Sequence, residues 1–244
     1  MDWMNSGLWI SLLEIIWVNI LLSGDNAVVI ALASRNLEPH HQRIAVVGGS
    51  GAAIVMRVVL TLFAVALLQL PWLKLIGSVL LLCVGVQLLL GEDERRAGAG
   101  LAGESVWTAI RTILIADLVM SLDNVLAVAA ATASTPAEAQ TPLLIVGLAL
   151  SIPLIVFGST LLLRLMEKLP LLITLGAALL GWVSGEMAAT DIGFLEVLYA
   201  NAPGLHEYHR LPETAGLIGA ILVIGMARLL QRRRPRAHLR EETR

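Results

Sequence analysis

Two copies of a Ser-x-Asp-Asn motif lie inside long apolar stretches of this 244-residue sequence. The first copy is in LLSGDNAVVIALA at residues 21–33, and the second is in VMSLDNVLAVAAA at residues 119–131. A carboxylate at the centre of a membrane-spanning helix costs about 2.5–3.5 kcal/mol on insertion scales. An acid that recurs at such a cost in the same local pattern indicates a functional site inside a membrane.

The candidate site residues are acids and their polar neighbours in the apolar segments, and all of them offer oxygen donors. They are Glu14, Ser23, Asp25, Asn26, Asp117, Ser121, Asp123, Asn124 and Glu186. Carboxylate, amide and hydroxyl oxygens suit a hard divalent cation such as Mn²⁺, Mg²⁺ or Ca²⁺. The sequence has one cysteine, Cys83, and no histidine in these segments, which disfavours zinc and copper. Intramembrane acids also carry protons, so H⁺ is a candidate coupling ion.

Helical spacing groups several of these residues on shared faces. Asp117, Ser121 and Asn124 follow an i, i+4, i+7 pattern and therefore share one face. Glu14 and Asp25 are eleven residues apart, so on a continuous helix they point within about 20° of each other. The aspartates of the two motifs lie off the shared faces on ideal helices. A local break that turns them inward is available to the first motif, which has a glycine before its aspartate, and not to the second.

Arg57 is a basic residue within a predicted span, where unpaired charge is costly. We expect it to act as the counter-ion of one of the acids when the site holds no cation.

The elements that must position these residues are membrane helices. The chain is 57% apolar and only 15% charged, whereas soluble domains have about 25% charged residues. Several apolar runs approach the ~20 residues that span a bilayer. We predict an all-α polytopic membrane protein with seven transmembrane helices. The predicted spans are residues 9–34, 44–69, 71–90, 107–132, 142–166, 170–190 and 213–231. The short joins at 69–71 and 167–170 predict that the helices they connect are antiparallel neighbours.

Basic residues gather in the loops on one predicted side of the membrane, which sets the orientation. On that side are Arg35, Arg43, Arg95, Arg96, Arg164, Lys168 and the tail RRRPRAHLREETR, whereas the opposite side has Lys74 and Arg210. The distribution predicts an external N-terminus and a cytoplasmic C-terminus in the cytoplasmic membrane. The first segment has no basic n-region and no cleavage site, so we interpret it as a retained span. The tail is interpreted as a topology anchor near anionic lipid rather than a nucleic-acid site.

A shift of 98 residues overlays the first half of the chain on the second. The matched pairs are Asn19 with Asp117, Ser23 with Ser121, Asp25 with Asp123 and Asn26 with Asn124. Because three spans repeat, the two halves must cross the membrane in opposite directions, as in secondary transporters whose sites lie between inverted repeats. We therefore predict a 3+3 inverted repeat plus one C-terminal helix. Its parts are repeat 1 (1–90), a cytoplasmic linker (91–106), repeat 2 (107–190), an external loop with the seventh helix (191–231) and a basic tail (232–244).

Three stretches resemble the TerC family of integral membrane proteins, and its YjbE-like branch most of all. They are LSGDNAVVIALA, DLVMSLDNVLAVAAA and GWVSGEMAATD at 181–191. The resemblance implies a seven-helix inverted-repeat fold with a role in Mn²⁺ export and metal homeostasis. The acidic motif positions that it implies are Asp25, Asn26, Asp123 and Asn124, with Asp117, Glu14 and Glu186 as companions.

Three functions fit the sequence. The first, a divalent metal exporter that works by alternating access, is the one we expect, although the direction of export comes from the resemblance alone. The second is an intramembrane aspartyl protease, in which two aspartates share a proton. The third is a partner without transport activity that supplies metal to secreted enzymes at the membrane. The asparagine after each motif aspartate and the additional acids favour coordination over proteolysis, so we predict that the protein is not an enzyme. Oligomeric state and metal selectivity are not set by the residues.

Overall fold

The computed structural model describes residues 24–68, 70–96, 105–132, 153 and 155–233, and no strand occurs among them. The helices are α2 (Gly24–Ser34), α3 (Pro39–Leu68), α4 (Leu73–Arg96), α5 (Val106–Thr132), α7 (Leu171–Ala189), α8 (Ile192–Asn201), the 3₁₀ turn η1 (Pro203–Glu207) and α9 (Leu211–Arg233). Residues 155–168 are also helical. The all-helical prediction is confirmed for this part of the chain.

Four helices in the described residues are long and apolar enough to cross a membrane. They are Pro39–Leu60, Leu73–Gly91, Leu171–Ala189 and Leu211–Arg232, and α2 and α8 are shorter apolar helices. Large apolar side chains such as Ile76, Phe157 and Ile221 are exposed on the outside of the bundle, as expected where lipid replaces water. Much of the predicted spans 9–34 and 142–166 lies outside the described residues, so the count of seven stays a prediction.

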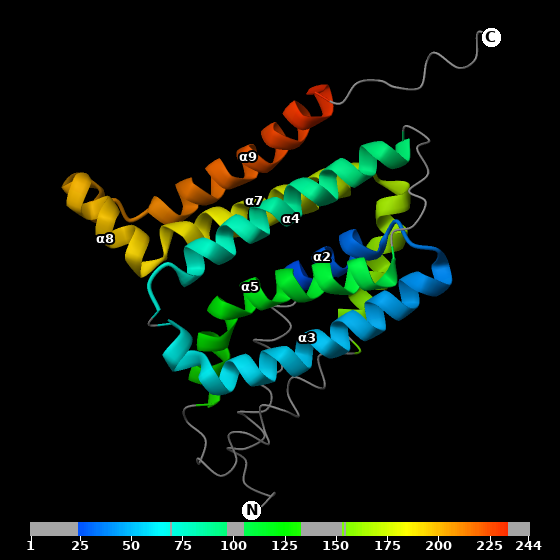
Figure 1. Cartoon of the computed structure of the whole chain (residues 1–244), viewed down its shortest axis with the longest axis horizontal. Coiled ribbons are helices and arrows are strands. Elements are labelled where there is room, and N and C mark those ends of the chain that lie inside the picture. Colours follow the sequence, from blue (N-terminus) through cyan, green and yellow to red (C-terminus); the bar gives the residue numbers. More distant parts are fainter. Residues whose placement is uncertain (1–23, 69, 97–104, 133–152, 154, 234–244) are drawn as a thin grey trace, which may run out of the picture.

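The described helices form two groups, and the helices of each group pack mainly against one another (Figure 1). In the first group α5 packs along α3, and α2 contacts both of them. In the second group α4, α7 and α9 contact one another, and contacts of α5 with α4 and of α2 with α7 join the groups. α2 is the most enclosed element, because its side chains from Val29 to Ser34 are all buried.

The predicted antiparallel pairing across the join at 69–71 is wrong. α3 packs mainly on α5, whereas α4 packs mainly on α7 and α9. A short connection limits the distance between two helix ends, but the apolar faces decide which helices pack along their length.

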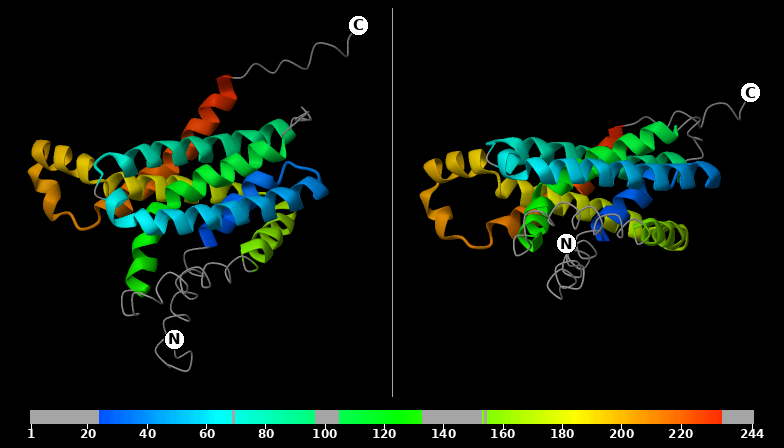
Figure 2. Two further views of the ribbon diagram at one scale, coloured as in Figure 1. Left: turned by 60° about the horizontal axis from the view of Figure 1, so that its bottom comes forward. Right: turned by 90° about the horizontal axis from the view of Figure 1, so that it is seen from below.

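Two helix boundaries and one predicted loop also differ from the predictions. α3 begins at Pro39, five residues before the predicted span, because proline suits the first turn of a helix. α4 continues to Arg96, so the first six residues of the predicted linker 91–106 are helical. Glutamate and arginine are good helix formers, and they extend the helix beyond its apolar part. The predicted external loop contains α8 and η1, and α8 projects past the ends of α4 and α7 (Figure 2).

Glycines allow α7 and α9 to approach until their backbones touch. A Cβ atom on Gly185 would lie 2.0 Å from the carbonyl oxygen of Ala215, and one on Gly219 would lie 2.0 Å from that of Gly181. Small residues four apart on one helix are typical of close helix contacts in membranes. Glycine is therefore required on both sides of this interface.

Two further glycines lie at contacts between the two helix groups. A Cβ atom on Gly176 of α7 would lie 2.8 Å from Val28 of α2, and one on Gly77 of α4 would lie 3.0 Å from Val119 of α5. In this third span the predicted repeat follows a shift of 99 residues, at which Gly77 matches Gly176. Each therefore brings a helix of one predicted half against the first helix of the other.

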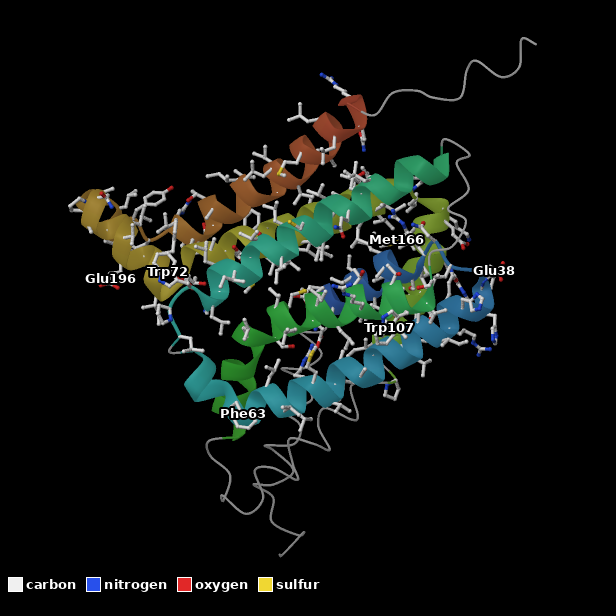
Figure 3. All side chains as sticks on the ribbon, viewed as in Figure 1. Glu38, Phe63, Trp72, Trp107, Met166 and Glu196 are labelled. Atoms are coloured by element: carbon white, nitrogen blue, oxygen red, sulfur yellow. The ribbon has the colours of Figure 1, made fainter. Side chains whose placement is uncertain are left out.

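The buried Asp191 joins the start of α4 to the start of α8. Its carboxylate accepts hydrogen bonds from the backbone N–H of Phe194 (2.9 Å), Trp72 (3.2 Å), Lys74 (3.1 Å) and Leu75 (3.2 Å). It thus caps two helix N-termini, whose first N–H groups have no partner within their own helix. Asp191 therefore has a structural role at the end of the bundle where Trp72 and Glu196 lie (Figure 3).

The turn before α4 has an unusual backbone at Trp72, whose φ of 69° is in the left-handed region. The indole ring packs against Gly193, where a Cβ atom would lie 2.8 Å from Trp72 Cε2. The Asp191 hydrogen bond and this ring contact hold a conformation that bulky residues rarely adopt.

Candidate metal centre

The two helices that carry the Ser-x-Asp-Asn motifs pack against each other. α2 presents Asn26, which is 3% exposed, and the half-buried Asp25, whose Oδ1 accepts a hydrogen bond from the Asn26 backbone N–H at 2.9 Å. α5 contains Asp123 and Asn124, whose side chains are outside the described part. The fold therefore brings both motif helices to one interface.

A closed set of polar contacts lies inside the bundle next to this interface. Arg57 of α3 donates from Nη2 to Asp117 Oδ1 and from Nε to Ser121 Oγ at 3.0 Å, and both partners are on α5. Ser121 Oγ donates in turn to Asp117 Oδ2 at 3.3 Å. The exposed fractions are 2% for Arg57, 6% for Asp117 and 0% for Ser121. The predicted common face of Asp117 and Ser121 is confirmed.

Charge pairing explains how this set is tolerated inside the protein. A buried guanidinium or carboxylate is strongly destabilising alone, but the ion pair and the shared serine satisfy both groups. The expectation that Arg57 pairs with one of the intramembrane acids is confirmed. α2 packs on α5, so the first motif lies on a helix that is adjacent to the helix of Asp117 and Ser121.

α5 is one continuous helix through the second motif, from Val106 to Thr132. Asp117 and Asp123 are six residues apart, so they are separated by roughly 120° around this helix. The backbone of α5 is helical throughout, but the helix bends toward its C-terminal end (Figure 2), so ideal helical spacing alone does not set the direction of Asp123.

The remaining candidates are not joined to this cluster. Glu14 and Ser23 lie outside the described residues. Glu186 is half-buried on α7, a helix that packs mainly on α4 and α9, and none of the described hydrogen bonds or ion pairs connects it to Arg57 or Asp117. The geometry therefore favours the donors on α2 and α5 over Glu186.

Sequence reasoning overlooked Ser50 of α3. It is 1% exposed, and its Oγ has no hydrogen-bond partner within the described part of the chain. Ser50 precedes Arg57 by seven residues, which places both on one face of α3. This i, i+7 spacing was the available signal.

The oxygen atoms of the described site residues that could coordinate a cation belong to two carboxylates, one amide and hydroxyl groups. No group of three or more His, Cys, Asp or Glu side chains lies together among the described residues. Asp25, Asn26, Asp117 and Ser121 therefore supply only part of the six or more oxygen ligands that a hard divalent cation prefers. Water molecules and the motif residues outside the described part would have to complete the shell.

The sequence comparisons agree with this apolar, helical architecture. The family described as "Integral membrane protein TerC family" matches residues 4–236. The chain belongs to the TerC family. It is an integral membrane protein with several membrane-spanning helices, which agrees with the apolar helices of the fold.

Relatives of this TerC chain occur in Bacillus subtilis (strain 168). The "Uncharacterized membrane protein YjbE" is 44% identical over 182 residues, which cover 75% of this chain and 80% of the relative. The "Uncharacterized membrane protein YkoY" is 23% identical over 234 residues, which cover 89% of this chain and 71% of that relative. The resemblance to the YjbE-like branch is confirmed. No solved structure gives a significant match to the chain.

Proposed function

We propose that this TerC protein exports Mn²⁺ across the cytoplasmic membrane by alternating access. The observation that carries the proposal is the buried Arg57–Asp117–Ser121 set beside the interface of α2 and α5. Its acceptors are all oxygens, which suit a hard cation. A purely structural polar contact between helices needs no charged group, so the buried charges favour a site for an ion.

Arg57 acts in this proposal as an internal cation that holds the site closed. When Mn²⁺ enters, it takes the place of the guanidinium at the Asp117 carboxylate and the Ser121 oxygen. Ionised Asp25, Asp117 and Asp123 together with Arg57 carry a net charge of −2, which one divalent cation neutralises. This balance favours a divalent over a monovalent ion, and protonation of the same acids offers a route to H⁺ exchange.

The inverted repeat is part of the proposal. It is supported by Gly77 and Gly176, which bring the third helix of each predicted half against the first helix of the other. Transport would then proceed by rocking the halves around a site between them. The charge arrangement is not symmetric, because the residue 98 positions after Arg57 is Ile155, which is buried.

The proposed direction and metal rest on different grounds. Export and Mn²⁺ follow from the family resemblance, whereas a hard divalent cation follows from the oxygen donors. The proposed orientation, with a cytoplasmic C-terminus, rests on the distribution of lysine and arginine.

The test is Mn²⁺ flux into proteoliposomes that contain the purified full chain. Wild type is compared with Asp25→Asn, Asp117→Asn and Asp123→Asn, which keep side-chain size but remove the charge. Glu196→Gln is the matched control, because Glu196 is exposed on α8 at the end of the bundle. We expect flux in wild type and the control, and loss of flux in the three aspartate variants that remain folded.

Three outcomes would contradict the proposal. Full flux in Asp25→Asn and Asp123→Asn would make the motifs helix-packing features. No flux in wild type, with Mn²⁺ still bound, would favour the partner that supplies metal to secreted enzymes, whereas cleavage of a membrane peptide would favour the protease.

A further inference from the structure

A cavity of about 600 Å³ opens between the first turns of α3 and the helix at residues 155–168. This volume is within the ~300–1,000 Å³ of typical ligand pockets. Its lining includes Gln42, Arg43 and Val46 from α3, and Val156, Leu163 and Arg164 from the facing helix. The cavity is at the end of the bundle where Glu38 and Met166 lie, opposite to Trp72 and Glu196 (Figure 3). It is therefore separate from the candidate metal centre and from the Asp191 caps.

The lining changes from charged to apolar along the cavity. On α3, Arg43 is in the second turn, and Val46 and Val47 follow one turn further into the helix. On the facing helix, Arg164 is near the end of the helix and Val156 is about two turns further in. Because both arginines are near helix ends at the same end of the molecule, the cavity is polar at its mouth and apolar inside.

The two arginines at the mouth are available for a ligand. Both are exposed, and within the described part of the chain no hydrogen bond or ion pair engages either guanidinium. The hydroxyl of Thr160, midway along the cavity, donates to the carbonyl oxygen of Val156 at 2.7 Å. This hydroxyl therefore needs no polar group from a ligand. The site thus has two positively charged guanidinium groups next to an apolar channel.

We infer that this cavity binds an anionic phospholipid, with the phosphodiester between Arg43 and Arg164 and an acyl chain along Val46 and Val156. A guanidinium group can donate two parallel hydrogen bonds to the oxygens of one phosphate. Basic pockets between membrane helices bind anionic lipid headgroups. Glu167 also lines the mouth, where its carboxylate repels a second negative charge and accepts a hydrogen bond from a hydroxyl. A glycerol headgroup supplies that hydroxyl, so phosphatidylglycerol is the ligand that fits best.

Native mass spectrometry of the purified full chain tests this inference. The protein in detergent is titrated with phosphatidylglycerol, with phosphatidylcholine, and with soluble glycerol 3-phosphate as the free phosphate. We expect phosphatidylglycerol to bind preferentially, and the double variant Arg43→Gln/Arg164→Gln to bind it at least about tenfold more weakly, because charge-assisted hydrogen bonds are lost. Arg210→Gln/Arg228→Gln is the matched control with two exposed arginines outside the cavity, and it should bind like wild type.

The inference is overturned by any of three results. Equal phosphatidylglycerol binding by both double variants would place the lipid elsewhere. Displacement of the lipid by glycerol 3-phosphate at equal concentration would assign the arginines to a soluble phosphate. A dimer that only Arg43→Gln/Arg164→Gln disrupts, without bound lipid, would assign the cavity to a second copy of the chain. Equal thermal unfolding of the two double variants controls for folding.

Discussion

Arg57 of α3 and Asp117 of α5 form a buried ion pair across the helix interface, although they are 60 residues apart in the chain. Ser121 contacts both members, so the three side chains form one unit. Inside a membrane protein such a unit is stable only when it is complete, because each partner alone leaves an uncompensated charge. The stability of the bundle is therefore coupled to the same residues that we propose for the transport site.

The ion pair should show strong energetic coupling. We expect Arg57→Met or Asp117→Asn alone to lower the free energy of unfolding by about 3–5 kcal/mol, because the remaining charge stays buried. The double variant should lose much less than the sum of the two. The measurement is a double-mutant cycle of unfolding in mixed detergent micelles.

The exposed contact between Glu38 and His41, at 3.8 Å, supplies the control cycle with Glu38→Gln and His41→Gln. An exposed pair should couple by less than about 1 kcal/mol. Additive effects at Arg57 and Asp117, equal to those of the control, would contradict a buried ion pair.

The Ser121 hydroxyl should contribute to metal affinity. Ser121→Ala removes an oxygen that the proposed Mn²⁺ would take over from Arg57, so we expect KM for Mn²⁺ to rise roughly tenfold, the equivalent of about 1.5 kcal/mol. Ser159→Ala is the control, because Ser159 is equally buried but donates only to the backbone of its own helix, to Ile155 at 2.8 Å. A KM that is unchanged in both variants would remove Ser121 from the site.

Asp191 should be essential for stability but not for metal affinity. Asp191→Ala removes the cap of α8 and leaves three N–H groups at the start of α4 without a carboxylate. At about 1 kcal/mol per cap, we expect a loss of about 2 kcal/mol or more in unfolding free energy. The folded fraction should keep the wild-type KM for Mn²⁺ in the flux assay. Glu196→Ala, at an exposed position of α8, should change neither quantity.

The contact between α7 and α9 should not tolerate a single added methyl group. Gly185→Ala would place Cβ 2.0 Å from the Ala215 carbonyl oxygen, so the helices must separate. We expect a loss of at least about 1–3 kcal/mol, the usual cost of overpacking a tight interior. Gly225→Ala on α9 is the matched control, since no atom lies within 4 Å of its added Cβ. Equal thermal unfolding of the two variants would show that the close approach is not required.

Several features could be predicted from the sequence because they depend on local pattern. Long apolar runs fix the membrane helices, and the i, i+4 spacing puts Asp117 and Ser121 on one face. The cost of charge in an apolar span indicated that Arg57 needs an acid. The shared site of the duplicated Ser-x-Asp-Asn motif stays a prediction. The helix bounds were less predictable, because α4 continues through charged residues that are good helix formers.

The partner of each buried charge was decided only by the tertiary structure. Nothing in the spacing distinguishes Asp117 from the other acids as the partner of Arg57. In the sequence Asp191 is only the last residue of an apolar motif. In the structure its carboxylate accepts hydrogen bonds from backbone N–H groups at the start of α4, more than a hundred residues earlier in the chain. Likewise, α3 and α4 pack on different helices although the connection between them is short. Helical periodicity encodes which side chains share a face, but which faces meet depends on packing among all the helices at once, and that packing determines where each charge finds its partner.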